Sequence, residues 1–379
     1  MTLITEQNEL EVFCNSIKNK KFITVDTEFL RDKTYYSKLC LIQIADDEKA
    51  VAIDPLSKNI DLTSLFSIFD NSNILKIFHS ARQDLEIILN LTGKIPKSVF
   101  DTQIAAMVCG FGDSVSYETL VNKLLNTALD KSCRYSDWSI RPLNDRQISY
   151  ALGDVTYLRD VYRKLNAMLH ENNRAEWIED EIALLINPET YKVRPSEMWK
   201  KIRIRSKEPK FLHLVQVLSE WREIKAQKLN IPRGYLLKDE PLLEIAAYAP
   251  VINKDLSKIR GLNAKIIYGE LGSEIVQLIK ENKGKSALYK EDFKYNISDN
   301  DTFELLLMLL KIKSEKENIA ERLIISKNDL KKFAIDKDLE ESPITKGWRY
   351  EVFGRDAEKI KDGKLAIAVK NNKFQFVDL

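Results

Sequence analysis

The sequence lacks the features that mark disulfide-bonded, zinc-binding and membrane-spanning proteins. It has four cysteines in 379 residues, Cys14, Cys40, Cys109 and Cys133, and they form no Cys-x-x-Cys pair. This spacing indicates neither a zinc site nor a disulfide framework, so we expect buried thiols in a reducing cytosol. No apolar run reaches bilayer-spanning length, and the first residues do not resemble a secretory signal. We therefore expect a cytoplasmic protein without a membrane partner.

The chain also lacks a strong excess of either charge, because its formal net charge at pH 7 is only +2. Global charge therefore does not mark it as a nucleic-acid-binding protein. Cations do gather locally, since residues 191–210 hold eight lysines and arginines against two glutamates. Such a stretch is either a surface for a polyanion or a solvated linker. We expect residues 191–209 to form a basic linker.

The length of the chain suits two or three domains, and 44% hydrophobic with 31% charged residues is typical of globular proteins. In residues 1–190, apolar runs of strand length alternate with amphipathic helices. The runs 22–29, 39–45 and 50–54 follow one another through polar turns, which predicts an antiparallel meander. Residues 74–79 predict a further strand, so an α/β domain is expected.

The strand at 22–29 carries two acids at alternate positions. Successive side chains of a strand point to opposite faces, so Asp26 and Glu28 share one face and Thr27 points away. Neighbouring carboxylates on a buried strand repel each other unless a cation neutralises them, and hard divalent cations prefer such oxygen ligands. The alternative is a strand end whose two acids simply face water.

Two further acids lie on predicted helices. Asp84 follows a strand and begins a helix, where its carboxylate is either aimed at a site or stabilised by the helix dipole. Asp154 and Tyr150 lie one turn apart on one helical face. We expect their helix to be capped by Asn144 and to continue toward Leu165.

The four carboxylates of Asp26, Glu28, Asp84 and Asp154 suit a site for two divalent metal ions. Two ions roughly 4 Å apart can activate water and stabilise the leaving oxygen in phosphodiester hydrolysis. Several acids are needed because each ion must be charge-balanced while it keeps positions for water and phosphate. Tyr150 is expected to orient the attacking water, because a phenol with a pKa near 10 is a poor base at neutral pH.

Other polar residues nearby are expected to have structural roles. His79 ends a predicted strand, and Asp101 precedes a helix as an N-cap residue does. The polar loop 131–143 mixes aromatic and basic residues, so it either contacts substrate at the rim of the site or packs against itself.

Three segments, residues 25–29, 79–86 and 150–158, resemble the DEDDy 3′–5′ exonucleases of the ribonuclease H-like superfamily. Residues 34–43 and 137–143 narrow the resemblance to the ribonuclease D family. The resemblance implies an α/β ribonuclease H-like mixed sheet flanked by helices. It also implies magnesium or manganese as cofactor and removal of nucleotides from RNA 3′ ends, notably those of tRNA precursors.

The same resemblance implies roles for five residues. Asp26, Glu28, Asp84 and Asp154 would ligate metal, and Tyr150 would assist the water. These residues match the family in type and order, and residues 1–190 would form the exonuclease domain.

The second half of the chain is predicted to be helical. Residues 210–290 resemble the HRDC domain, a helical nucleic-acid-binding module, and residues 298–379 resemble a second, divergent HRDC-like domain. The cations that would bind phosphate in the first are Arg222, Lys225, Lys228, Arg233 and Lys238. A bundle that acts only as a spacer is the alternative. The alternating pattern around Asn371-Asn372 predicts a C-terminal β-hairpin.

We therefore predict a monomeric, metal-dependent 3′–5′ exoribonuclease. One alternative is an exonuclease of the same chemistry that acts on DNA. Another is a non-catalytic nucleic-acid-binding protein, which four mutually repelling acids argue against. A helicase-associated module is disfavoured because the sequence has no Gly-x-x-x-x-Gly-Lys phosphate-binding loop.

Overall fold

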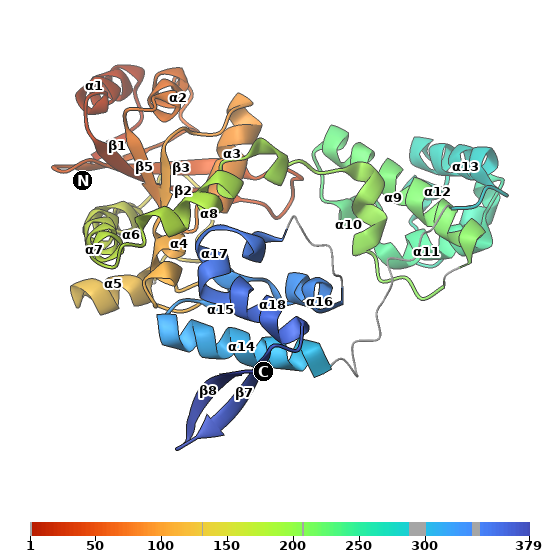
Figure 1. The fold of residues 1–379 in the computed structure, drawn as a ribbon. Coiled ribbons are helices and arrows are strands. Elements are labelled where there is room, and N and C mark those ends of the chain that lie inside the picture. The colour runs from red at the N-terminus through yellow and green to blue at the C-terminus, as the bar shows by residue number, and fades with distance from the viewer. Residues whose placement is uncertain (1, 131, 207, 288–300, 336–341) are drawn as a thin grey trace. The chain divides into compact units, whose positions relative to one another are not determined.

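The computed structural model describes residues 2–130, 132–206, 208–287, 301–335 and 342–379. The chain divides into two compact units (Figure 1). The first unit comprises Met1–Glu28, Cys40–Thr190 and Tyr295–Leu379, and the second comprises Phe29–Leu39 and Tyr191–Lys294. None of the helices in the described ranges combines the length and apolar character needed to cross a bilayer.

The first unit is built on a six-stranded sheet with the order β1-β4-β3-β2-β5-β6. β3 and β4 are antiparallel, whereas the pairs β1–β4, β2–β5 and β5–β6 are parallel, so the sheet is mixed as the family resemblance implies. β1 was not predicted because three residues carry no readable alternation. The strands are β1 (Thr2–Ile4), β2 (Phe22–Leu30), β3 (Lys38–Ala45), β4 (Ala50–Ile53), β5 (Leu75–Phe78) and β6 (Val99–Asp101).

Helices flank this sheet (Figure 1). Their apolar stripes explain their burial: in α1, for example, Leu10, Phe13 and Ile17 recur at helical spacing and are buried. The helices are α1 (Gln7–Ile17), α2 (Thr63–Asp70), α3 (Arg82–Thr92), α4 (Thr102–Val108), α5 (Tyr117–Leu125), α6 (Asp145–Thr156), α7 (Leu158–Glu171) and α8 (Glu179–Leu185), with short 3₁₀ turns at Ala175–Ile178 and Pro188–Thr190.

One predicted helix is interrupted. The expected continuous helix from Asn144 toward Leu165 was wrong, because the chain turns at Tyr157 between α6 and α7. The Thr156 hydroxyl donates to the carbonyl oxygen of Leu152 at 2.7 Å, and the next backbone bond, from Tyr157 to Gly153, is stretched to 3.5 Å. Side-chain bonding of this kind competes with the helical ladder and bends helices.

The C-terminal region of the first unit is helical and ends in a hairpin that extends from the helices (Figure 1). The predicted hairpin is confirmed: Asn371 and Asn372 have φ of 52° and 58°, as a tight two-residue turn requires. The elements are α14 (Asp301–Glu317), α15 (Glu321–Ile324), α16 (Lys327–Ile335), a 3₁₀ turn at Pro343–Thr345, α17 (Gly347–Arg349), a π-helical turn at Tyr350–Gly354, α18 (Arg355–Lys361), β7 (Leu365–Lys370) and β8 (Lys373–Asp378).

This C-terminal region packs against residues that follow α7 in the sheet-containing part of the first unit. The rings of Trp177 and Trp348 stack with centroids 4.4 Å apart and planes 4° apart. Arg349 is buried and forms ion pairs with Asp180 and Glu181. The two parts of the first unit therefore share aromatic, ionic and apolar contacts.

The second unit is a bundle around the long helix α9. Part of the predicted basic linker belongs to its core, because Ile202 is buried there and Trp199 packs against it. One of its elements, Asn253–Lys258, is a 3₁₀ turn. The elements are η3 (Pro195–Lys201), α9 (Pro209–Leu229), α10 (Arg233–Leu236), α11 (Asp239–Tyr248), η4 (Asn253–Lys258), α12 (Ala264–Ile267) and α13 (Glu270–Asn282).

Candidate active site

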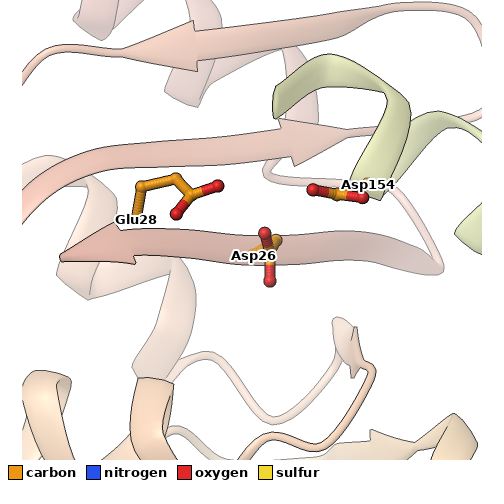
Figure 2. A group of neighbouring side chains, drawn as sticks. All are labelled: Asp26, Glu28 and Asp154. Atoms are coloured by element: carbon orange, nitrogen blue, oxygen red, sulfur yellow. The ribbon is translucent and has the colours of Figure 1, made fainter. Parts of the chain in front are cut away.

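Three of the predicted acids meet at one place in the first unit. Asp26 and Glu28 project from β2, and Asp154 approaches them from α6 (Figure 2). One carboxylate oxygen of each lies within 4.8 Å of the others, and all three side chains are partly buried. Carboxylate oxygens this close form a ligand set that divalent magnesium or manganese prefers.

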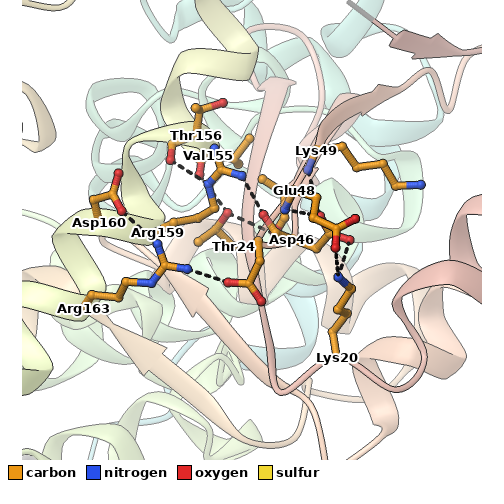
Figure 3. Close-up of polar contacts among 12 residues, drawn as sticks. Lys20, Thr24, Asp46, Glu48, Lys49, Val155, Thr156, Arg159, Asp160 and Arg163 are labelled. Carbon is orange, nitrogen blue, oxygen red and sulfur yellow. Dashed lines mark hydrogen bonds and ion pairs between the residues drawn. The ribbon is translucent and has the colours of Figure 1, made fainter.

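The strand and the helix are joined directly beside these acids. The hydroxyl of Thr24, two residues before Asp26 and fully buried, donates to the carbonyl oxygen of Val155 at 2.8 Å (Figure 3). Val155 follows Asp154, so this bond fixes α6 against β2 at the site. Arg159, on α7, ties that helix to the turn after β3, because its Nη1 donates to the carbonyl oxygen of Asp46 at 2.7 Å.

The start of the same helix is fixed by its capping residues. The Asn144 side chain accepts from the backbone N–H of Gln147, and the Gln147 side chain accepts from the backbone N–H of Asn144. This capping box confirms the predicted start of α6. Farther along α6, Tyr150 and Asp154 line one cavity together with Asp26.

Asp84 lies outside the group of three. It is buried in the first turn of α3, and its Oδ1 accepts a hydrogen bond of 2.5 Å from the Thr27 hydroxyl. Burial raises the pKa of Asp84 well above its usual value, and the charge of Asp26 raises it further. Asp26 thus interacts with Asp84 as well as with the carboxylates of Glu28 and Asp154.

The electrostatics of the group fit a cation site. Burial, and then the neighbouring charges of Asp26 and Asp154, raise the pKa of Glu28 to about 9. Burial also raises the pKa of Asp154 to about 7, and burial together with Asp154 raises that of Asp26 well above its usual value. Burial and mutual repulsion therefore favour the protonated forms of these groups when no cation is present, and a divalent ion would replace those protons.

Tyr150 lines a cavity of about 220 Å³ together with Asp26, Asp154 and Arg134. The ring of Trp138 lies behind it with a centroid distance of 6.1 Å. Burial, and then the nearby carboxylates, raise the pKa of the Tyr150 phenol, so this group stays protonated. A protonated phenol donates a hydrogen bond and does not act as a base.

The structural roles expected for His79 and Asp101 are confirmed. The His79 ring nitrogens lie 3.0 Å from Thr102 Oγ1 and 3.2 Å from the Val115 carbonyl oxygen, so both have partners. Asp101 caps α4 by accepting from the backbone N–H of Gln103. His79 also lines the cavity that contains Asp26 and Tyr150, and its two hydrogen-bond partners fix its ring there.

Sequence reasoning missed the anchor of the polar loop. Arg141 donates to both carboxylate oxygens of Asp54, at 2.6 and 2.7 Å, and to the carbonyl oxygens of Cys40 and Trp138, at 2.7 Å each. The loop therefore packs onto β3 and the end of β4, and it carries Trp138 to its place beside Tyr150. Asp54 and Arg141 are 87 residues apart, and no local pattern links them.

Two of the predicted phosphate-binding cations of the second unit are already paired within the bundle. Arg222 is buried and donates to Asp239 and to the carbonyl oxygen of Leu237. Lys225 is paired with Glu274. These two cations therefore hold the bundle together, which makes them poor candidates for contacts with a polyanion.

Comparison with known protein families matches two separate parts of the chain. Residues 1–170 match the model of the 3′-5′ exonuclease domain, and residues 211–279 match the model of the HRDC domain. The second HRDC-like domain at 298–379 stays a prediction.

Whole-chain relatives are similar over nearly the full length. Ribonuclease D of Bartonella henselae is 42% identical over 378 residues, which cover 98% of this chain and 93% of that protein. Ribonuclease D of Sphingobium indicum is also 42% identical, with coverage of 98% and 97%. The crystal structure of Escherichia coli RNase D, described as an exoribonuclease involved in structured RNA processing, matches with a TM-score of 0.82, 27% identity and coverage of 96% and 98%. The chain therefore belongs to the ribonuclease D family and is a 3′–5′ exoribonuclease.

Proposed function

We propose that Asp26, Glu28, Asp84 and Asp154 hold two divalent cations, magnesium or manganese, and that this site hydrolyses the last phosphodiester bond at the 3′ end of RNA. The observation that carries the proposal is the meeting of three carboxylates within 4.8 Å on β2 and α6. The products are a 5′-mononucleotide and an RNA shortened by that nucleotide.

Asp26 would help to hold the cations, because it interacts with each of the other three acids. It lies in the group with Glu28 and Asp154, and its charge also raises the pKa of Asp84. Bound divalent cations supply charge that stabilises the phosphate oxygens and makes a water molecule acidic. The carboxylates provide the matching negative charge and orient the cations.

Tyr150 would orient the attacking water within the cavity that it lines. Its protonated phenol lies one helical turn before Asp154, and Trp138 supports its ring. Arg134 lines the same cavity and is a cation that can face the phosphate. The bound cations would make the attacking water acidic, and Tyr150 would act as a hydrogen-bond donor that positions this water.

We infer that the natural substrates are structured RNAs, with tRNA precursors first among them. The similarity to E. coli RNase D over 96% of the chain supports this class of substrate. We also infer a monomer that works in the cytoplasm.

Digestion of a 3′-extended tRNA tests this function. The RNA and a single-stranded DNA of equal length carry 5′ labels and are incubated with magnesium, with manganese or with EDTA. A ladder that shortens from the 3′ end on RNA alone, and that EDTA erases, is the expected result. Equal shortening of DNA would contradict the assignment of RNA as the substrate. Bound but uncut RNA would favour a binding protein without catalytic activity.

A further inference from the structure

The end of α6, just after Asp154, is where the helical hydrogen bonds weaken. The chain turns at Tyr157, and the backbone bond from the N–H of Tyr157 to the carbonyl oxygen of Gly153 is stretched to 3.5 Å. Gly153 directly precedes Asp154. A backbone carbonyl oxygen inside a protein needs a good donor, so this one requires a partner from outside its own helix.

Tyr117 of α5 provides that partner. Its hydroxyl donates a hydrogen bond of 3.0 Å to the carbonyl oxygen of Gly153, and it accepts one from the backbone N–H of Leu158, the first residue of α7. A tyrosine hydroxyl can donate and accept at the same time. Burial raises the pKa of the Tyr117 phenol well above its usual value, so the hydroxyl keeps the proton that it donates. One side chain thus bridges the two helices at their junction.

The position of Tyr117 is set by residues outside α6 and α7. Tyr117 is the first residue of α5, whose N-cap residue Ser116 accepts from the backbone N–H of Thr119. The ring centroid of Tyr117 lies 5.5 Å from that of His79. His79 is held in turn, because its Nε2 lies 3.2 Å from the carbonyl oxygen of Val115. The hydroxyl is therefore a fixed point against which the end of α6 is located.

Both residues next to Asp154 have their carbonyl oxygens held by a side-chain hydroxyl. Thr24 of β2 donates to the carbonyl oxygen of Val155 at 2.8 Å, and Tyr117 of α5 donates to that of Gly153. The backbone that carries the Asp154 carboxylate is thus bonded on either side to another element. Tyr117 also lines the same cavity as Asp154. Loss of its hydroxyl would release one of the two bonds that locate this carboxylate.

We propose that Tyr117 is a positioning residue of the exonuclease site. By holding the carbonyl oxygen of Gly153, its hydroxyl keeps the Asp154 carboxylate close to that of Asp26, and it thereby raises the affinity of the acids for a divalent cation. Tyr117 acts through the backbone, because its hydroxyl proton is already engaged by Gly153. This inference rests on the proposed function, because it takes the acids as a cation site.

Magnesium binding to the full chain, measured without RNA, tests this role. Thermal melts of the wild type, Tyr117→Phe and Tyr162→Phe are recorded in EDTA and with rising magnesium, and the melts in EDTA show that each variant folds. Tyr117→Phe keeps the ring and removes only the hydroxyl. Tyr162→Phe is the matched control, because Tyr162 is a partly buried tyrosine that packs against the same apolar cluster as Tyr117. Single-turnover cleavage and an RNA titration in EDTA complete the comparison.

We expect Tyr117→Phe to need about 3- to 10-fold more magnesium for half of the maximal rise in melting temperature. The single-turnover rate at low magnesium should fall about tenfold and recover in part as magnesium is raised, whereas the RNA affinity in EDTA should stay unchanged. Tyr162→Phe should respond to magnesium as the wild type does.

A purely structural role for the Tyr117 hydroxyl would lower the melting temperature equally with and without magnesium. That result, or the same change in magnesium requirement for Tyr162→Phe, would overturn the inference. A wild type whose melting temperature does not respond to magnesium would overturn the proposed cation site and this inference with it. The two failures are therefore distinguishable by the behaviour of the wild type.

Discussion

The Thr24 hydroxyl donates a hydrogen bond of 2.8 Å to the carbonyl oxygen of Val155 and thereby ties β2 to α6 beside the clustered acids Asp26 and Asp154. Asp26 lies two residues beyond Thr24, and Asp154 directly precedes Val155. One buried bond between residues 131 apart in sequence thus controls the spacing of two carboxylates from different elements.

Replacement of Thr24 by valine should lower both stability and activity. Valine keeps the shape but leaves the Val155 carbonyl oxygen without this donor, at a cost of about 1–3 kcal/mol. A shift of α6 would also separate Asp154 from Asp26, so kcat should fall about tenfold or more. Chemical denaturation and single-turnover cleavage measure the two effects.

Thr24→Ser is the matched control, because it keeps the hydroxyl. It should retain most of the activity that Thr24→Val loses. If the valine and serine variants cleave RNA at the wild-type rate, the bond does not position the site.

Replacement of Asp26 by asparagine should abolish cleavage and stabilise the metal-free protein. The change removes a carboxyl group whose charged form burial and Asp154 disfavour, so the metal-free protein no longer bears the cost of ionising that group. RNA binding should persist, since the cations of the second unit are unchanged. Thermal melts in EDTA, cleavage assays and RNA titrations check the three outcomes, and equal loss of binding and cleavage would contradict this division of roles.

The pH dependence of stability should differ between the metal-free and metal-bound protein. Glu28 and Asp154 have folded-state pKa values of about 9 and about 7, above those of the unfolded chain. Their contribution to the free energy of unfolding is therefore fully present below about pH 4, and it is lost as the pH rises through 7 and then 9.

Magnesium should raise the melting temperature more at pH 8 than at pH 5.5, because at the lower pH protons compete with the cation for the carboxylates. Differential scanning fluorimetry with magnesium or EDTA at both pH values measures this difference. The same titration on Asp26→Asn should show a much smaller effect of magnesium. A magnesium effect that is independent of pH would contradict the assignment of these carboxylates.

Tyr150→Phe should slow cleavage about 10- to 100-fold and leave RNA affinity unchanged. The phenylalanine ring still packs against Trp138, so only the hydroxyl donor is lost. Because the pKa of Tyr150 is raised, the rate of the wild type should show no inflection from tyrosine ionisation below pH 10. An unchanged rate in Tyr150→Phe would remove the residue from the mechanism.

Trp348→Ala should destabilise the first unit by about 2 kcal/mol or more, since it removes a partly buried ring from the stack on Trp177. Trp348→Phe keeps an aromatic partner and should lose less. Denaturation followed by tryptophan fluorescence and by circular dichroism separates loss of the stack from loss of the fold. Equal stability of the alanine variant would show that the C-terminal region is held by its other contacts.

Local patterns in the sequence predicted much of this structure. A run of apolar residues of strand length located the strand with Asp26 and Glu28, and the cap at Asn144 located the start of α6. The two asparagines at 371 and 372 located the hairpin turn because few other residues adopt positive φ. These features depend on residues close together in the chain.

Features that depend on distant partners were not predictable in the same way. The hydrogen bond from Thr27 to Asp84 joins residues 57 apart, and the fork between Arg141 and Asp54 joins residues 87 apart. The turn at Tyr157 arises because the Thr156 hydroxyl bonds to the carbonyl oxygen of Leu152, which the helical backbone also uses. The apolar periodicity of the helix gives no sign of this bond. The metal-ligand roles of the acids stay a prediction that the geometry supports.

The most direct test of the cation site is the rate of RNA cleavage as magnesium is added back to EDTA-treated protein, for the wild type and for Asp26→Asn. The wild type should be inactive after chelation and should recover with rising magnesium, whereas Asp26→Asn should stay inactive at every concentration. Cleavage by the wild type without any divalent cation, or recovery of Asp26→Asn to the wild-type rate, would contradict the role given to these carboxylates.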